Sequence, residues 1–351
     1  MTDVLRVGGV LAASGEVKYG PLATFDMRDG TPVSIPVIVV KGIKEGKTLL
    51  CVAGHHANET LGIEAVIQVA QEKLNPKNMK GAFIGIPCAT PFGFHIGMRT
   101  NVLDEDTVMP HYPGKADGIL SERIAKVIWD NAVILADAVI DLHSNFKPAL
   151  NFTLVRRVHD EEVSEEALRL AKLCGVTTIQ TEEQVLSGHP QAKEGGQEGN
   201  LVEMAMYEGK PAFYLEGDGS NTLDQKDVDV MVRGILNVCK DMGIIEGMIE
   251  EQKGIKVVKA RSGMKLVPLS GMMVRANRGG IVAKVIEPGE FVEKGGVIAR
   301  IHNLYGEEVE VVRAPVSGYT WGFPLRTKSG LQTQAVFSGA EVCYWFHETP
   351  K

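Results

Sequence analysis

The sequence predicts an α/β domain, built on a mixed sheet flanked by helices, followed by a smaller all-β module. From about Ile35 to Ile245, short apolar runs alternate with amphipathic stretches, which is typical of a sheet covered by helices. After about Ile255 the helical periodicity ends, and short β-rich runs are separated by Gly and Pro turns. The length of 351 residues suits two domains of roughly 150 residues each. We expect them at residues 1–250 and 251–351.

The elements expected in the first domain follow from these two patterns. The strands are short apolar runs bounded by turn-forming residues: Ile35–Val40, Thr48–Ala53, Ala82–Pro87, Ala138–Leu142, Asn151–Val155, Val176–Gln180 and Ala212–Glu216. The helices have apolar residues at helical spacing: Glu59–Leu74, Ile119–Leu135, Glu162–Leu173, Asn200–Glu208 and Gln225–Met242. The last helix is the clearest, because Gly243 follows its periodic pattern as a stop.

The second region contains β-rich runs at Gly280–Ile286, Val297–His302 and Glu308–Val312. Two further passages, Val285–Gly295 and Ala314–Gly318, resemble the turns of the lipoyl/biotinyl barrel-sandwich fold. Neither passage supplies the hairpin Lys, flanked by Met or acidic residues, on which such carriers are modified. We therefore interpret this region as a structural or substrate-shaping module.

Composition and charge exclude several classes of protein. The chain has 37 Lys and Arg residues against 44 Asp and Glu, a formal charge of −7, and no basic block to neutralise phosphates, so nucleic acid is not an expected partner. No apolar stretch is long enough for a membrane span, and the N-terminus lacks the pattern of a signal peptide. We expect a cytoplasmic protein without a membrane partner. A homo-oligomer is expected only because most oligomers are of that kind.

A first cluster of polar residues follows the strand Thr48–Ala53, at the edge where open α/β sheets bind their ligands. His56 and Glu59 lie three positions apart at a junction of strand and helix, so an imidazole nitrogen and a carboxylate can converge on one cation. The spacing alone is weak evidence. His159 and Glu162 repeat it in a charged run, where a solvated helix start is the natural interpretation.

Two more strands end in polar residues. His143 follows an apolar strand and offers a third ligand, and two His with one carboxylate and an open position form the hydrolytic zinc arrangement. Asp141 lies on the same strand face and can accept a hydrogen bond from a ligand imidazole. Alternatively, His143 is a polar cap and Asp141 a helix-capping residue. With zinc nearby, the strand-end Glu216 would be the general base.

Together these motifs resemble the succinylglutamate desuccinylase/aspartoacylase family, which is related in fold to the zinc carboxypeptidases. The resemblance covers most of the chain. The family's Gly-x-His-Gly-Asn-Glu corresponds to Gly54–Glu59, which implies that His56 and Glu59 are zinc ligands and leaves His55 outside the ligand set. The family's appended β domain, similar to the lipoyl fold, corresponds to the region after Ile255.

The same resemblance implies the remaining site residues. The family's Asp-Leu-His corresponds to Asp141–His143 and makes His143 the third zinc ligand, while the strand-end catalytic Glu corresponds to Glu216. The segment Pro91–Arg99 is similar to the family's Asn-Pro motif that ends in Arg, so Arg99 is expected to polarise the carbonyl or stabilise the oxyanion. A guanidinium suits this role because it stays charged throughout the reaction.

The match fails where the family binds the α-carboxylate of its substrate. The family's Asp-Leu-Asn-Arg is Thr107–Pro110 in this chain, and Met109 and Pro110 offer neither charge nor a side-chain donor. Either the substrate has no carboxylate at this point, or another cation reaches it. The candidates for that cation are Arg156, Arg157 and Lys193.

The resemblance implies a zinc-dependent amidohydrolase or deacylase that cleaves the amide bond of a small N-acylated amino acid, or a related amide, by metal-activated water. Two alternatives stay open. A carboxypeptidase-like peptidase is weakened by the missing Asn-Arg pair, since it must bind a terminal carboxylate. A metal- or ligand-binding protein without turnover is disfavoured, because Glu216 and Arg99 would then have no reason to accompany the ligands.

Overall fold

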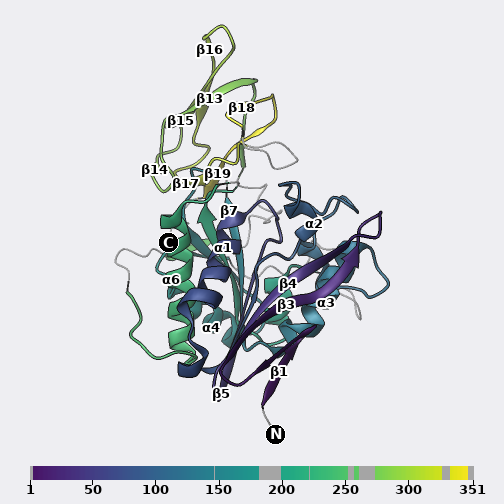
Figure 1. The fold of residues 1–351 in the computed structure, drawn as a ribbon. Coiled ribbons are helices and arrows are strands. Elements are labelled where there is room, and N and C mark those ends of the chain that lie inside the picture. Colours follow the sequence, from purple (N-terminus) through teal and green to yellow (C-terminus); the bar gives the residue numbers. More distant parts are fainter. Residues whose placement is uncertain are drawn as a thin grey trace.

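A nine-stranded mixed sheet forms the centre of the computed structural model, which describes residues 3–145, 147–181, 199–220, 222–251, 257–260, 273–325 and 333–346 (Figure 1). The strand order is β11-β9-β8-β10-β7-β5-β6-β4-β3. The strands are β3 (Glu16–Asp26), β4 (Pro32–Lys41), β5 (Lys44–Ala53), β6 (Lys80–Ile86), β7 (Ala138–Asn145), β8 (Phe152–Arg156), β9 (Thr177–Thr181), β10 (Ala212–Asp218) and β11 (Val257–Ala260). A separate hairpin of β1 (Val4–Val7) and β2 (Val10–Ala13) precedes them.

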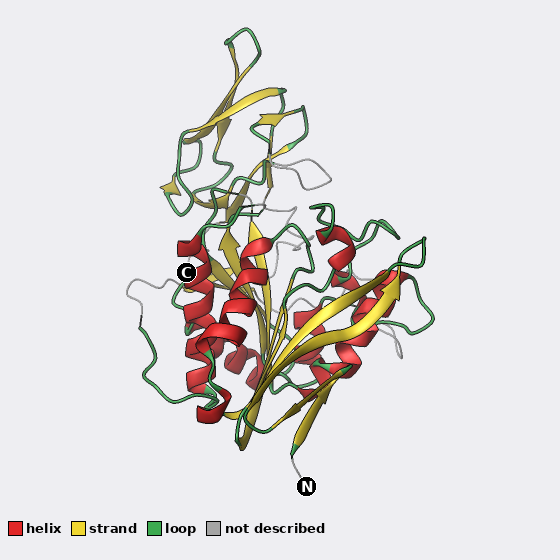
Figure 2. Ribbon diagram, in the orientation of Figure 1, coloured by secondary structure: helices red, strands yellow, loops and turns green. Residues whose placement is uncertain are grey.

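Helices cover both faces of this sheet, with α1, α4 and α6 on one side and α2 and α3 on the other (Figures 1 and 2). The helices are α1 (Thr60–Gln68), α2 (Pro91–Phe94), α3 (Leu120–Asn131), α4 (Glu161–Lys172), α5 (Leu201–Tyr207) and α6 (Gln225–Asp241). Short helical turns are η1 (Val69–Lys73), η2 (Pro76–Asn78), η3 (Met109–His111) and η4 (Val133–Leu135). Their apolar faces pack onto buried strands such as β7, so one continuous core fills the domain.

The structure confirms each strand and helix expected in the first domain, with ends that differ by a few residues. The central strands were predictable because apolar runs such as Leu49–Ala53 are fully buried between two helical layers. The long edge strand β3 was not expected. Most of its residues are exposed or half-buried, and its pairing with β4 shifts register between Pro21 and Ala23, so its sequence lacks a clear apolar pattern.

The later described strands form two small antiparallel sheets, which confirms an all-β region, while its barrel-sandwich form stays a prediction. One sheet has the order β12-β19-β17-β14 and the other β16-β15-β13-β18. The strands are β12 (Met273–Arg275), β13 (Gly280–Lys284), β14 (Phe291–Val292), β15 (Val297–His302), β16 (Glu308–Arg313), β17 (Gly318–Gly322), β18 (Ala335–Val336) and β19 (Glu341–Phe346). They share a core that includes Ile298, Ile301 and Val342. We call this region the β module; β11 lies in the main sheet.

The β module contacts the main domain through the segment that leads into β8. The Trp321 ring stacks on Phe152, with centroids 5.1 Å apart and planes at 8°. The backbone N–H of Leu150 donates to the Trp321 carbonyl at 2.6 Å, and Ala149 forms a β-bridge with Gly322. A Cβ at Gly322 would lie 2.9 Å from the Ala149 Cβ, so this close approach requires glycine.

Candidate active site

Three neighbouring parallel strands, β5, β7 and β10, end at the same edge of the sheet. His143 on β7 is paired with Glu216 on β10, so the two side chains point to the same face. After β5 the chain turns at Gly54, whose φ is +64° and whose position leaves only 2.9 Å between a Cβ and the Cys88 Cα. Only glycine fits this turn, which delivers the following histidines and Glu59 to the same edge.

Three donor atoms converge at this edge. The Nδ1 atoms of His56 and His143 lie 2.9 Å from Glu59 Oε1 and Oε2, respectively, and 3.2 Å from each other. All three side chains are buried. Ligand atoms about 2.0–2.1 Å from a tetrahedral zinc are roughly 3.3 Å apart. The group therefore has the separations that a small metal ion requires, and it could hold one.

A second group, His55, Asp141 and His143, is also compact enough for a metal. Its side-chain atoms are already used, however. Nδ1 of His55 lies 2.8 Å from Asp141 Oδ1, and Nε2 lies 2.6 Å from the hydroxyl of Tyr112. Because both ring nitrogens of His55 have partners, the group around His56 is the better metal candidate.

The pKa shifts of the two histidines show how charge is distributed around this group. Burial and the nearby Arg99 charge lower the pKa of His56 to about 3, so its ring is neutral and has a lone pair to offer. Burial opposes charge on His143, but Asp141 and Glu59 raise its pKa well above the usual value. The two carboxylates beside His143 therefore favour positive charge at this point, which a bound metal ion would also supply.

Arg99 reaches this cluster from the segment that follows α2. Its Nη1 lies 2.6 Å from Glu59 Oε1, and its side chain keeps a partial exposure of 24 %. Burial alone would raise the pKa of Glu59, but His56, Arg99 and His143 together hold it well below the usual range. Arg99 therefore brings a permanent positive charge to the open side of the candidate metal group.

Glu216 lies beside the cluster and retains affinity for a proton near neutral pH. Burial, with smaller contributions from Glu59 and Asp141, raises its pKa to about 7, against the opposing charges of His143 and Arg99. Asn145 donates from Nδ2 to Glu216 Oε2 at 3.0 Å and fixes the carboxyl group. A carboxylate with such a pKa is suited to general-base chemistry.

The structure also places the two residues at which no carboxylate clamp was expected. Met109 and Pro110 lie in the turn η3, half-buried, with no charged group on either side chain. Of the replacement cations, Lys193 lies outside the described residues. Arg157 pairs with Glu161 at 3.0 Å on the surface.

Arg156 is the replacement cation that lies closer to the site. Its Nη1 is 2.8 Å from Glu203 Oε1, and its guanidinium carbon lies 5.5 Å from the centre of the Tyr214 ring. Tyr214 in turn packs against the ring of His143, with centroids 5.8 Å apart. Glu216 is among the charges that raise the pKa of Arg156. Arg156 thus lies near the cluster through Tyr214, with its charge paired to Glu203.

The second His-x-x-Glu motif behaves as a helix start, as the sequence indicated. His159 and Glu162 are exposed, and Asp160 caps α4 by accepting a hydrogen bond from the Val163 N–H at 3.1 Å. Both motifs follow a buried strand, and burial of the side chains separates them, since His56 and Glu59 are buried whereas His159 and Glu162 are exposed.

Sequence reasoning missed two contributors to the site. Asn145, which binds Glu216, ends the same strand as His143, and its polar type at that strand end was an available signal. Tyr112, which binds His55, lies 57 positions away from its partner in the sequence, and its local Tyr-Pro-Gly pattern gives no sign of this contact.

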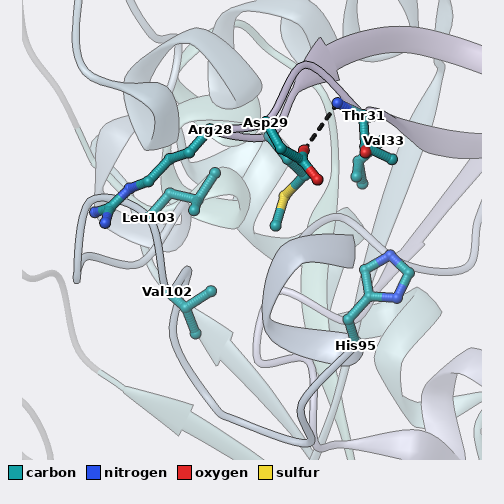
Figure 3. Close-up of a pocket in the computed structure, with 8 residues that line it drawn as sticks. Arg28, Asp29, Thr31, Val33, His95, Val102 and Leu103 are labelled. Carbon is teal, nitrogen blue, oxygen red and sulfur yellow. Dashed lines mark hydrogen bonds between the residues drawn. The ribbon is translucent and has the colours of Figure 1, made fainter.

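A separate open cavity of about 470 Å³ lies between the β3–β4 hairpin and the segment after α2 (Figure 3). It is lined by Met27, Arg28, Asp29, Thr31, Val33, His95, Val102 and Leu103. None of the candidate site residues lines it. Across the described part of the chain, no helix is both long and apolar enough to span a membrane.

Comparisons with known proteins agree with this geometry. Residues 45–242 match the model of the succinylglutamate desuccinylase/aspartoacylase catalytic domain. The N-alpha-acetyl-L-2,4-diaminobutyric acid deacetylase of Halomonas elongata is 26% identical over 275 residues, which are 78% of this chain and 75% of that protein.

Solved structures share the fold over nearly the whole chain. A succinylglutamate desuccinylase from Silicibacter sp. TM1040 has a TM-score of 0.78 and 21% identity, covering 94% of each chain. The product-bound ectoine utilization protein EutE (DoeB) from Ruegeria pomeroyi has a TM-score of 0.78 and 20% identity, again covering 94% of each chain. The match of the family model to more than half of the sequence shows that the chain belongs to the succinylglutamate desuccinylase/aspartoacylase family.

Proposed function

We propose that this protein is a zinc-dependent deacylase that hydrolyses the amide bond of a small N-acylated amino acid or related amide. The convergence of His56, Glu59 and His143 beside Glu216 is the observation that carries the proposal. Family membership supports deacylation of amides, and the donor set of two imidazoles and one carboxylate is the one used by hydrolytic zinc sites.

Each group then has a distinct role. When bound, zinc acidifies a water molecule and polarises a carbonyl group. Glu216 takes the proton from the attacking water and delivers it to the leaving nitrogen, so the products are a carboxylic acid and an amine. Arg99 offers a fixed positive charge for the oxyanion that develops on the former carbonyl oxygen.

Substrate recognition differs from that of relatives that use an Asn-Arg clamp. The relative from Halomonas elongata is named for an N-acetylated diamino acid, which supports a small N-acyl substrate. Because Met109 and Pro110 cannot hold a carboxylate, we expect a weak dependence of the reaction on an α-carboxylate. A carboxypeptidase must bind a terminal carboxylate, so the absence of charged groups on Met109 and Pro110 also favours deacylation over carboxypeptidase activity.

The test measures metal content by elemental analysis in the wild type, in His143→Ala and in His159→Ala. His159 is the matched control, since it belongs to the exposed copy of the same motif. We expect one equivalent of zinc in the wild type and in His159→Ala, and its loss in His143→Ala. A zinc content that is equal in all three proteins would overturn the metal site.

Amine release from a panel of N-acyl amino acids and neutral N-acyl amines tests the reaction itself. We expect hydrolysis by the wild type, with neutral amides accepted alongside the amino acid derivatives. Cleavage of short peptides at their C-terminus, without cleavage of N-acyl amines, would instead support the peptidase alternative.

A further inference from the structure

A buried chain of side chains runs from Tyr112 through His55 and Asp141 to His143. The Tyr112 hydroxyl lies 2.6 Å from His55 Nε2, His55 Nδ1 lies 2.8 Å from Asp141 Oδ1, and Asp141 Oδ2 lies 3.1 Å from His143 Nε2. We propose that Tyr112 and His55 are positioning residues that act through Asp141 to aim His143 Nδ1 at the metal. This inference rests on the proposed metal site.

The direction of each hydrogen bond in this series of side chains follows from the Asp141 carboxylate. Asp141 directs one carboxylate oxygen at His55 and the other at His143, and a carboxylate offers oxygen acceptors to the imidazoles on both sides. His55 therefore donates from Nδ1, its Nε2 accepts, and the Tyr112 hydroxyl donates to it. The other carboxylate oxygen, Oδ2, faces Nε2 of His143 at 3.1 Å in an ion-pair contact.

In the neutral ring that a metal requires, this arrangement favours one tautomer of His143. With its proton on Nε2, the ring presents the lone pair of Nδ1 toward His56 and Glu59, where the other two donors lie. Within the described residues, neither His143 Nε2 nor Asp141 Oδ2 makes a hydrogen bond, and the two buried atoms face each other in a 3.1 Å ion-pair contact. Partners of this kind orient a metal-binding imidazole and raise its basicity.

The surroundings hold the chain rigid. His55 and Tyr112 are fully buried, and the His55 ring stacks parallel to His143, with centroids 5.9 Å apart and planes at 11°. Thr90 donates to the His55 carbonyl at 3.0 Å. The backbone of Tyr112 exchanges two hydrogen bonds with Gly199, of 2.9 and 2.8 Å. Each member is thus fixed on two sides, as a positioning role requires.

The experiment titrates metal-free protein with zinc alone, in competition with a chromophoric chelator, and needs no substrate. Removal of an outer partner of a ligand histidine typically weakens metal binding about 10- to 100-fold. We expect such a loss in Tyr112→Phe and in His55→Leu. His55→Asn introduces a side chain of about the size of Leu that keeps a donor toward Asp141. Its zinc affinity should therefore recover toward the wild-type value.

Tyr214→Phe is the matched control. Tyr214 is also a buried tyrosine beside His143, but its hydroxyl donates to Glu203 at 2.6 Å and not to this chain. We expect its zinc affinity to stay within about threefold of the wild type, because the Asp141 contact is intact. The visible spectrum of bound Co²⁺ gives a second readout, which should change in Tyr112→Phe and not in Tyr214→Phe.

The outcomes separate this inference from the proposed function. If the wild type binds zinc through His143 and Tyr112→Phe binds it equally well, the positioning role is wrong and the metal site stands. An equal loss in Tyr112→Phe and Tyr214→Phe would also overturn it, as general destabilisation. Complete loss in His55→Asn, matching His143→Ala, would make His55 a ligand itself. A wild type without zinc affinity would refute the proposed function.

Discussion

The α/β domain and the β module contribute to the site in different ways. The candidate reactive side chains come from the ends of β5, β7 and β10 in the α/β domain. The β module reaches the same region through Trp321, which stacks on Phe152, and Phe152 is the strand partner of Glu216. The comparison indicates that the candidate reactive groups lie in the domain, while the module packs against the strand beside Glu216.

The two regions also differ in how completely they are buried. In β7 every residue except the last is buried, whereas β16 has a single buried residue among half-buried and exposed ones. The tip of the module exposes Leu304 and Tyr305 almost entirely. Substitutions at exposed positions of the module, such as those at its tip, should therefore be tolerated.

The largest effect is expected on turnover, from a substitution of a candidate reactive group in the α/β domain. Glu216→Gln should keep its metal but lose turnover by about 10²- to 10⁴-fold, the usual cost of losing a general base. Measurement of kcat together with metal content tests this. Asp218→Asn is the matched control, because Asp218 lies on the same strand and accepts a hydrogen bond from the Ala149 N–H. Full activity in Glu216→Gln would remove that residue from the reaction.

An intermediate effect is expected where module and domain meet. Trp321→Ala removes a buried ring that packs on Phe152 and should lower the free energy of unfolding by about 3–5 kcal/mol. Turnover should fall less than in Glu216→Gln, since no reacting group is lost. Urea unfolding of this variant is compared with Tyr305→Ala, which alters an exposed ring at the module tip. Identical unfolding midpoints would show that the contact does not couple the two regions.

The smallest effect concerns an ion bridge between α4 and α6. Arg169 binds Asp241 with two contacts of 2.7 and 2.6 Å, and these hydrogen bonds lower the pKa of Asp241. The bridge therefore stabilises the fold above the unfolded-state pKa of about 4, and this stability is lost as the pH falls through the lower folded-state value. Because Arg169 is half exposed, we expect about 1 kcal/mol or less at pH 7.

Urea unfolding of wild type and Asp241→Asn at pH 7 and pH 3 measures this bridge. The difference between the two proteins should shrink at pH 3, and metal content and amine release at pH 7 should be unchanged. A difference that grows on acidification would contradict the assigned direction of the pKa shift.

The sequence allowed prediction of those features that short stretches of residues encode. Buried strands of continuous apolar residues, such as Leu49–Ala53, and strand ends with unusual polar residues, such as His143, were recognisable one at a time. The order of strands in the sheet, and the contact of Tyr112 with His55, depend on which distant segments pack together. Edge strand β3 was missed because an exposed strand needs no apolar repeat.

The distance along the chain between the donor groups has a consequence for how the protein acquires a cation. His56 and Glu59 are neighbours in sequence, but His143 lies 87 and 84 positions from them. A partly folded chain offers only the local pair, and the third donor arrives when β7 pairs with β5. Metal binding at the proposed site should therefore follow folding of the sheet. A bound ion would then raise the free energy of unfolding, because it would bind the folded chain far more tightly than the unfolded one.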